Sequence, residues 1–309
     1  MKEKLVVIVG PTAVGKTKTS IELAKALHGE VISGDSMQVY RGMDIGTAKI
    51  KREEMEGVPH HLIDICDPIE SFSVASFQSR VKPLITSINE RGHIPFIVGG
   101  TGLYIKAVTH DYQFAKAPSD PRYREELEAF VEVHGVEELH KQLKEVDPLS
   151  YETIHPNNYR RVIRALEVYH LTKRTIGDFQ EKQPDESPYD LVMIGLTMDR
   201  KVLYERINLR VDLMIKQGLI EEAERLYAQG VRDCQSVQAI GYKEIYEYIE
   251  GKVSKQEAIE LLKRNSRRYA KRQLTWFRNK ADVTWFDLTD GDTYEKIAEI
   301  KNFVEGKLF

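Results

Sequence analysis

A phosphate-binding loop lies near the start of the chain. The stretch "GPTAVGKT" fits the pattern G-x-x-x-x-G-K-[ST]. In this pattern the backbone N–H groups converge on phosphate oxygens, and the start of the following helix adds a partial positive charge. Lys16 is placed to reach the outer phosphate oxygens, and the hydroxyl of Thr17 is placed to ligate Mg²⁺. The predicted phosphate-binding residues are Gly10, Pro11, Thr12, Ala13, Val14, Gly15, Lys16 and Thr17.

The flanking sequence supplies the elements that this loop needs on either side. Before it, "LVVIV" is a short apolar run of the kind expected for a buried parallel strand. After it, "TSIELAKALH" places Ile21, Leu23, Ala24 and Leu27 at spacings that suit an amphipathic helix. A strand, a glycine loop and a helix in succession are the context that distinguishes a phosphate loop from a chance glycine turn.

Composition is that of a soluble globular protein. The 309 residues are 41% hydrophobic and 30% charged, enough for one large or two moderate domains. No apolar run has the length of a membrane span, and the first strand begins too early for a signal peptide. Cys66 and Cys234 are far apart, which argues against a disulfide framework and against a zinc site. We therefore expect a cytoplasmic protein with no membrane contact.

Positive charge is concentrated in one tract near the C-terminus. Residues 261–280 contain eight basic residues and no acidic residue, although the net charge of the chain is −3. On a helix, Arg264, Arg268 and Lys271 fall on one stripe, with Arg267 beside it. Such a run is often only a solvated face, but the complete absence of acids favours contact with a polyanion such as a nucleic-acid backbone.

Strand and helix signals alternate over about the first 110 residues, which is typical of a doubly wound sheet. Helical periodicity without strands then dominates, until "LVMIGL" restores a buried strand and "VTWFDL" adds another near the C-terminus. The prediction is an α/β fold: a parallel sheet flanked by helices, as in P-loop NTPases, with an inserted all-helical domain. We assign residues 1–115 and 190–309 to the core, and residues 116–189 to the insertion.

Hydrolysis of ATP or GTP is disfavoured. Such enzymes place an acid at the end of another apolar strand, but the best candidate, "IPFIV", ends in "GGTG", and no N-K-x-D motif is present. Asp64 could supply such an acid to hold Mg²⁺, but the strand predicted for it, "HHLIDI", is short. Asp35 comes directly after the strand "EVIS", where ligand crevices of parallel sheets lie. Its carboxylate could hold Mg²⁺, cap the next helix or take a proton from a nucleophile, and these alternatives stay open.

Several longer blocks resemble a known family. The stretches "GPTAVGKT", "SGDSMQVYRGMDIGTAK", "PHHLIDICDPIESFSVASF", "PFIVGGTGLYIKA", "NNYRRVIRALEV", "QAIGYKE" and "AKRQLTWFRN" occur in this order. Together they resemble the bacterial tRNA dimethylallyltransferases, also called tRNA isopentenyltransferases. The resemblance spans nearly the whole chain and is weakest in the helical insertion. The zinc-finger extension of eukaryotic relatives is not found in the sequence.

The resemblance implies transfer of a dimethylallyl group from dimethylallyl diphosphate to N6 of adenosine 37, in tRNAs that read codons beginning with U. It implies Mg²⁺ as cofactor, the anticodon stem-loop of tRNA as partner, and a monomer. Asp35 would be the general base, and Arg210 would bind the diphosphate with Lys16 and Thr17. The residues implied to contact tRNA are Asp35, Ser36, Met37, Gln38, Thr101, Tyr159, Arg160, Arg161, Val162 and Ile163, with Arg124 as a weaker candidate.

Three other functions remain as alternatives. A nucleotide or small-molecule kinase would share the loop, Lys16 and Mg²⁺, but leaves the basic tract unexplained. An isopentenyltransferase acting on free adenine nucleotides is closer in chemistry, although the long insertion and the basic tract favour tRNA. A non-catalytic RNA-binding module would leave the phosphate loop without a role.

Overall fold

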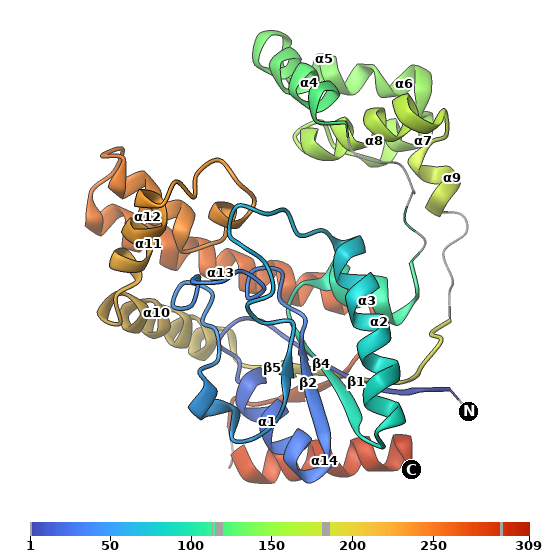
Figure 1. The fold of residues 1–309 in the computed structure, drawn as a ribbon, viewed down its shortest axis with the longest axis vertical. Helices are drawn as coiled ribbons and strands as arrows, with labels where there is room; N and C mark the ends of the chain where they lie inside the picture. The colour runs from blue at the N-terminus through green and yellow to red at the C-terminus, as the bar shows by residue number, and fades with distance from the viewer. Residues whose placement is uncertain (1, 113, 115–119, 181–185, 291–292) are drawn as a thin grey trace. The chain divides into compact units, whose positions relative to one another are not determined.

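The computed structural model describes residues 2–112, 114, 120–180, 186–290 and 293–309 (Figure 1). The chain forms two compact units. One consists of Met1–Thr109 and Ser187–Phe309, and the other of His110–Glu186. The sequence predicted an insertion over residues 116–189, and the first of these boundaries lies outside the described residues. Each unit is described by itself below.

Six parallel strands form a sheet in the described part of the larger unit, in the order β3-β2-β4-β1-β5-β6. The phosphate loop follows β1, which lies between β4 and β5, with Val6 opposite both Phe96 and Val192. The central position of β1 explains its continuous apolar sequence, because this strand is covered by helices on both faces of the sheet. The strands are β1 (Lys4–Val9), β2 (Gly29–Ser33), β3 (His60–His61), β4 (Ile94–Gly99), β5 (Asp190–Thr197) and β6 (Thr284–Asp287).

Helices cover both faces of the sheet. Val6 and Ile8 of β1 pack in one cluster with α1 and α14, whereas Leu5, Val7 and Val9 pack in another with α2 and α3. This division follows from the alternation of side chains along a strand. Because both clusters pack against β1, they hold the strand end at which the phosphate loop begins. These helices are α1 (Lys16–Ala26), α2 (Val74–Glu90), α3 (Gly102–Thr109) and α14 (Thr293–Leu308).

Four further helices complete the larger unit. The 26-residue α13 begins at a capping box, in which Ser254 Oγ accepts from the Glu257 amide and the Glu257 carboxylate accepts from the Ser254 amide. Helix α13 packs against α3, α10 and α12, and thereby joins the sheet to the C-terminal helices. The helices are α10 (Arg200–Lys216), α11 (Leu219–Ala228), α12 (Tyr242–Ile249) and α13 (Lys255–Lys280), with short 3-10 turns η1 (Arg52–Met55) and η2 (Ser236–Gln238).

The smaller unit contains helices joined by short turns, and no strand, in its described residues 120–180. Leu139 and Val162 are fully buried in its core. Glu167 is also fully buried, and its carboxylate pairs with Arg124 (Nε–Oε1 2.7 Å) and Arg164 (Nη1–Oε2 2.5 Å). A buried carboxylate requires such partners. The helices are α4 (Pro121–His134), α5 (Val136–Lys141), α6 (Leu143–Val146), α7 (Pro148–Thr153), α8 (Tyr159–Thr172) and α9 (Ile176–Gln180).

The predicted fold class is confirmed, and two local features differ from the sequence-based expectation. Strand β3 covers only His60–His61 of the expected "HHLIDI", because Leu62 and Asp64 have φ angles of 61° and 55° and turn the chain out of the sheet. Helix α14 follows the expected last strand and was not predicted. No helix within the described residues combines the length and the apolar composition needed to cross a membrane.

Candidate active site

Two glycines give the phosphate loop its shape. Gly10 and Gly15 have φ angles of 149° and 116°, which only glycine adopts without strain. A Cβ on Gly10 would also lie 2.6 Å from the Leu196 carbonyl oxygen of β5. Gly15 ends the loop directly before Lys16, the first residue of α1. The loop therefore connects the buried end of β1 to the N-terminus of α1, as the motif predicts.

Lys16 folds back over its own loop. Its Nζ donates hydrogen bonds to the carbonyl oxygens of Gly10 at 3.0 Å and Pro11 at 2.9 Å. Burial, reinforced by the positive charge of Arg210 and opposed by the carboxylate of Asp35, lowers the pKa of Lys16 to about 8. Because two neighbouring cations repel each other, the binding of an anion between them is favoured.

Arg210 reaches the loop from α10. Its Nη1 donates to Thr12 Oγ1 at 3.4 Å. Burial lowers the pKa of this guanidinium, and the charge of Asp35 opposes that shift. Arg206, one turn earlier on α10, is exposed and also lines the cavity at the loop.

A cavity of about 450 Å³ brings the cations and the carboxylate together. Lys16, Thr17 and Arg210 line it, and so do Asp35 and Gln38. The predicted loop residues do not all face this space. Those that line the cavity are Thr12, Ala13, Gly15, Lys16 and Thr17. Gly10, Pro11 and Val14 are buried and are not among its lining residues.

A second cavity of about 310 Å³ has Asp35 and Arg210 on its wall as well. Ser36 and Met37 line it on one side, and residues 238–240 line it on another. Asp35 therefore borders both cavities. One is rich in phosphate-binding groups, and the other has more apolar lining, including Met37. A reaction between a phosphorylated compound and a second, less polar compound would use both cavities.

Asp35 is held by the turn that follows β2. Its Oδ1 accepts a hydrogen bond from the Met37 amide at 2.8 Å. The Ser36 amide donates to Thr101 Oγ1 at 3.2 Å, which joins this turn to the end of β4. Gly34 and Gly99 make the approach possible, because a Cβ on Gly99 would lie 2.4 Å from the Gly34 backbone. The turn that carries Asp35 is thus held against the segment that carries Thr101, and the contact of both residues with tRNA stays a prediction.

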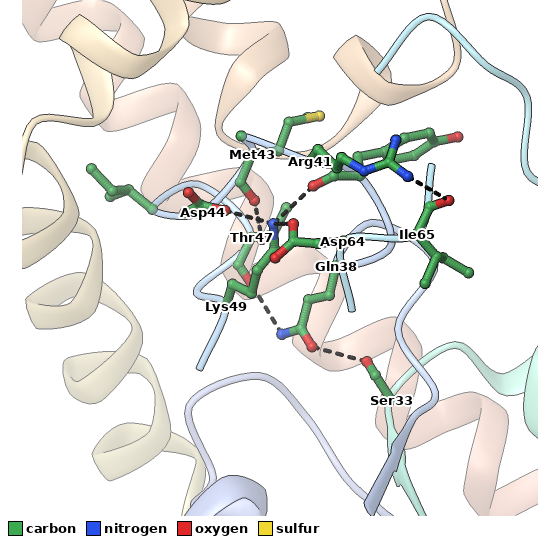
Figure 2. Close-up of polar contacts among 12 residues, drawn as sticks. Ser33, Gln38, Arg41, Met43, Asp44, Thr47, Lys49, Asp64 and Ile65 are labelled. Atoms are coloured by element: carbon green, nitrogen blue, oxygen red, sulfur yellow. Dashed lines mark hydrogen bonds and ion pairs between the residues drawn. The ribbon is translucent and has the colours of Figure 1, made fainter. Parts of the chain in front are cut away.

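Lys49 organises the segment 34–49 that carries Asp35 (Figure 2). Its side chain is 5% exposed, and its Nζ donates to Tyr40 O at 2.8 Å, Asp44 Oδ1 at 2.6 Å and Asp64 Oδ1 at 2.5 Å. Gln38 adds a second tie, because its Oε1 accepts from Ser33 Oγ at 2.9 Å. Asp64, which the sequence offered as a candidate acid for holding Mg²⁺, instead forms an ion pair with Lys49.

Sequence reasoning missed Tyr269 and Gln273 of α13. Gln273 is 5% exposed, its Oε1 accepts from the Thr12 amide and its Nε2 donates to the Gly100 carbonyl. Burial and the charge of Asp35 raise the pKa of Tyr269 to about 12. Both residues line the larger cavity. A signal existed: Tyr269 and Gln273 fall on the apolar stripe of the helix with Leu262 and Phe277, where an amide is out of place.

The basic stripe of α13 is accessible. Arg264, Arg268 and Lys271 are exposed, and within the described part of the chain none of them takes part in an ion pair. Arg267, beside the stripe, donates instead to Asn208 Oδ1 at 2.6 Å. A shallow hollow of about 520 Å³ on the same helix is lined by Arg268, Lys271 and other residues up to Lys280.

In the smaller unit, the predicted RNA-contact residues lie at the start of α8. Arg160 and Arg161 are exposed and Tyr159 is half-buried. Val162 and Ile163 are 0% and 3% exposed in the core, so their side chains do not face solvent. Arg124 is bound to Glu167, as described above. The RNA contacts of all six residues stay predictions.

Comparisons with known proteins give one consistent match. A family model described as IPP transferase matches residues 38–280. A tRNA dimethylallyltransferase of Halalkalibacterium halodurans is 67% identical over 310 residues, which cover 100% of this chain and 98% of that relative.

Solved structures agree with this match. The full-length tRNA isopentenylpyrophosphate transferase of Bacillus halodurans is 67% identical, with a TM-score of 0.77 over 99% of this chain and 97% of that one. A eukaryotic dimethylallyltransferase described as acting on tRNA is 31% identical, with a TM-score of 0.83 over 97% of this chain and 78% of that one.

Proposed function

This chain belongs to the IPP transferase family, and from that membership we propose that it transfers a dimethylallyl group from dimethylallyl diphosphate to N6 of adenosine 37 in tRNAs that read codons beginning with U. The observation that carries the proposal is the shared cavity, which is lined by the cations Lys16 and Arg210 and also by the carboxylate of Asp35. Cations suit a diphosphate leaving group, and a carboxylate suits an amine that must lose a proton.

The first half of the reaction is departure of diphosphate. The bond between the allylic carbon and oxygen breaks, and negative charge grows on the phosphate oxygens. Lys16 and Arg210 both line the cavity, and we propose that, together with the loop amides, they stabilise that charge. The planar guanidinium of Arg210 can bind two phosphate oxygens at once.

Mg²⁺ fits the donor set at this position. Thr17 lies exposed in the first turn of α1, and Asp35 lines the same cavity. Mg²⁺ is commonly held by one or two protein oxygens together with substrate phosphates and water, so a dense carboxylate cluster is not required. When bound, the ion would neutralise part of the charge that develops on the diphosphate. We propose Thr17 as its protein ligand.

The second half of the reaction is attack by the adenine amine. Its lone pair is delocalised into the ring, so removal of a proton during formation of the carbon–nitrogen bond helps. We propose that the Asp35 carboxylate accepts this proton, while the base enters the second cavity beside Ser36, Met37 and Thr101. The adenine must leave the stacked anticodon loop to reach it. A monomeric state and a cytoplasmic location stay predictions.

The test is a transfer assay with the purified protein. It is incubated with Mg²⁺ and labelled dimethylallyl diphosphate, and is offered tRNA, AMP or no acceptor. Label in tRNA alone supports the proposal, and its loss from a tRNA with guanosine at position 37 locates the site. Label in AMP would identify an enzyme acting on free nucleotides. ATP-dependent phosphorylation without prenyl transfer would identify a kinase.

A further inference from the structure

The second cavity is lined by residues from distant parts of the sequence. Two of its walls are formed by residues 46–48, in the segment that also carries Asp35, and by residues 238–240, and helices α10 and α13 contribute others, among them Val211 and Leu262. No helix lies within residues 34–49, all of which the structure describes, and a single bridge pairs Tyr40 with Cys66. A long irregular segment of this kind has no ladder of its own to hold it in place. Its shape depends on side chains that tie it to the rest of the fold.

Glu222 of α11 supplies one such tie. It is 4% exposed, and its carboxylate accepts hydrogen bonds from three successive backbone amides: Asp44 at 3.1 Å, Ile45 at 3.0 Å and Gly46 at 3.2 Å. The Tyr242 hydroxyl donates to the same carboxylate at 2.5 Å. Hydrogen bonds to an ionised acceptor are stronger than neutral ones. One buried carboxylate therefore holds a whole turn of the segment.

Tyr242 extends this tie to the opposite wall. It is the first residue of α12, two residues after Ile240, and it is fully buried. Its ring packs against Gly46 so closely that a Cβ there would lie 2.4 Å from a ring carbon. Burial and the charge of Glu222 raise the pKa of Tyr242, so its hydroxyl stays protonated and available as a donor. Glu222 thus contacts Gly46, which belongs to one wall, and Tyr242, which lies two residues beyond the other.

Neither Glu222 nor Tyr242 lines either cavity at the phosphate loop. Their contacts lie behind the walls, whereas Lys16 and the loop are held separately by β1, α1 and Gln273. Thr47 and Ala48 line both cavities, whereas Lys16 and Arg210 belong to other elements, α1 and α10. We therefore expect loss of the Glu222 carboxylate to disturb the base-binding side more than the cations that would bind the diphosphate. The role of Glu222 can therefore be tested by measuring donor binding and tRNA turnover separately.

We propose that Glu222 is a positioning residue for the acceptor: by binding the amides of residues 44–46 and the Tyr242 hydroxyl, it sets the spacing between the two walls that receive the adenine. The proposal rests on the proposed function, because it presumes that a tRNA base enters this cavity. It assigns no contact between Glu222 and substrate.

Glu222→Gln is the sharpest test. The amide is nearly isosteric, but its NH₂ group cannot accept, so at least one of the backbone amides is left without a partner. Misplacement by about 1 Å can cost on the order of 100-fold in rate. We expect kcat/KM for tRNA to fall by about 10- to 100-fold, while the Kd for dimethylallyl diphosphate changes by less than about twofold. Tyr242→Phe keeps the carboxylate and the three amides, and a loss of only about threefold is expected.

Glu221→Gln is the matched control, because Glu221 is the exposed neighbour on the same helix, and wild-type kinetics are expected. Wild-type kcat/KM for tRNA in Glu222→Gln overturns the proposal. So does an equal loss of donor and tRNA binding, which would mark general destabilisation. If Glu222→Gln does not fold, Tyr242→Phe decides between the same outcomes. Absence of tRNA labelling by the wild-type protein would instead refute the proposed function.

Discussion

The side-chain oxygen of Gln273 accepts a hydrogen bond from the backbone amide of Thr12 at 3.0 Å. Its Nε2 donates to the Gly100 carbonyl at 3.2 Å. Helix α13 therefore contacts the phosphate loop and the end of β4 through one buried side chain, while its exposed face carries the basic stripe. The Thr12 amide is committed to this contact, which leaves the remaining amides of the loop to meet phosphate.

Replacement of Gln273 should weaken donor binding. Gln273→Ala leaves the Thr12 amide and the Gly100 carbonyl without their partner, and an unsatisfied buried group costs about 1–3 kcal/mol. We expect the Kd for dimethylallyl diphosphate to rise by about 5- to 100-fold, measured by calorimetry. Thr275→Ala, at an exposed position of the same helix, serves as control. Unchanged donor affinity would show that the contact does not shape the loop.

Asp35 should be essential for the chemical step. Asp35→Asn keeps an oxygen that can accept from the Met37 amide but cannot take up a proton. We expect the single-turnover rate at saturating donor and tRNA to fall by about 10²- to 10⁴-fold. Asp67→Asn, at an exposed carboxylate, is the control. A rate equal to that of the wild-type protein would remove Asp35 from the role of general base.

Lys16 should make donor binding dependent on pH. Its pKa of about 8 in the free protein lies below its ordinary value of 10.5, so the ammonium loses its proton as pH rises through about 8. A bound diphosphate favours the charged form, so binding should take up a proton near and above pH 8 and none well below it. Calorimetry in buffers of different ionisation enthalpy measures this uptake.

The lowered pKa of Lys16 also fixes the direction in which the free energy of unfolding depends on pH. Between pH 8 and 10.5 the unfolded chain keeps the Lys16 proton that the folded protein has lost, so this group makes stability rise with pH in that window. Lys16→Met should abolish both the proton uptake and this contribution. Lys18→Met, at the exposed position two residues on, should retain both. Proton uptake that persists in Lys16→Met would assign the titration to another group.

The basic stripe should govern the salt dependence of tRNA binding. Each phosphate contact contributes about 0.7 to 0.9 to the slope of log K against log salt concentration. Replacement of Arg264, Arg268 and Lys271 by alanine should reduce this slope by about 2 to 3. Replacement of Lys301 and Lys307 on α14, which packs on α1 and β5, should leave the slope unchanged. An unaltered slope in the triple variant would show that the stripe is only a solvated face.

Local patterns in the sequence predicted those parts of the site that depend on local backbone geometry. The loop follows from its glycines, and the position of Asp35 follows from its place after a strand of a parallel sheet. Gln273 and Glu222 could not be found this way. Each acts on backbone groups more than 170 residues away in the sequence, and such contacts leave only a misplaced polar residue in an apolar stripe.

Two strand predictions show the same limit. The apolar run of β1 marked its strand correctly, because both of its faces are covered. At β3 the run "HHLIDI" predicted a short strand, and left-handed conformations at Leu62 and Asp64 end it after two residues. Those conformations deliver Asp64 to Lys49, a long-range pairing that no local pattern encodes.

The contact between Gly34 and Gly99 places a limit on redesign of this protein. Any side chain at position 99 would separate the ends of β2 and β4, and with them Asp35 and Thr101. Efforts to accept other acceptor bases should therefore keep this glycine pair and vary Met37 or residues 238–240, whose side chains line the second cavity.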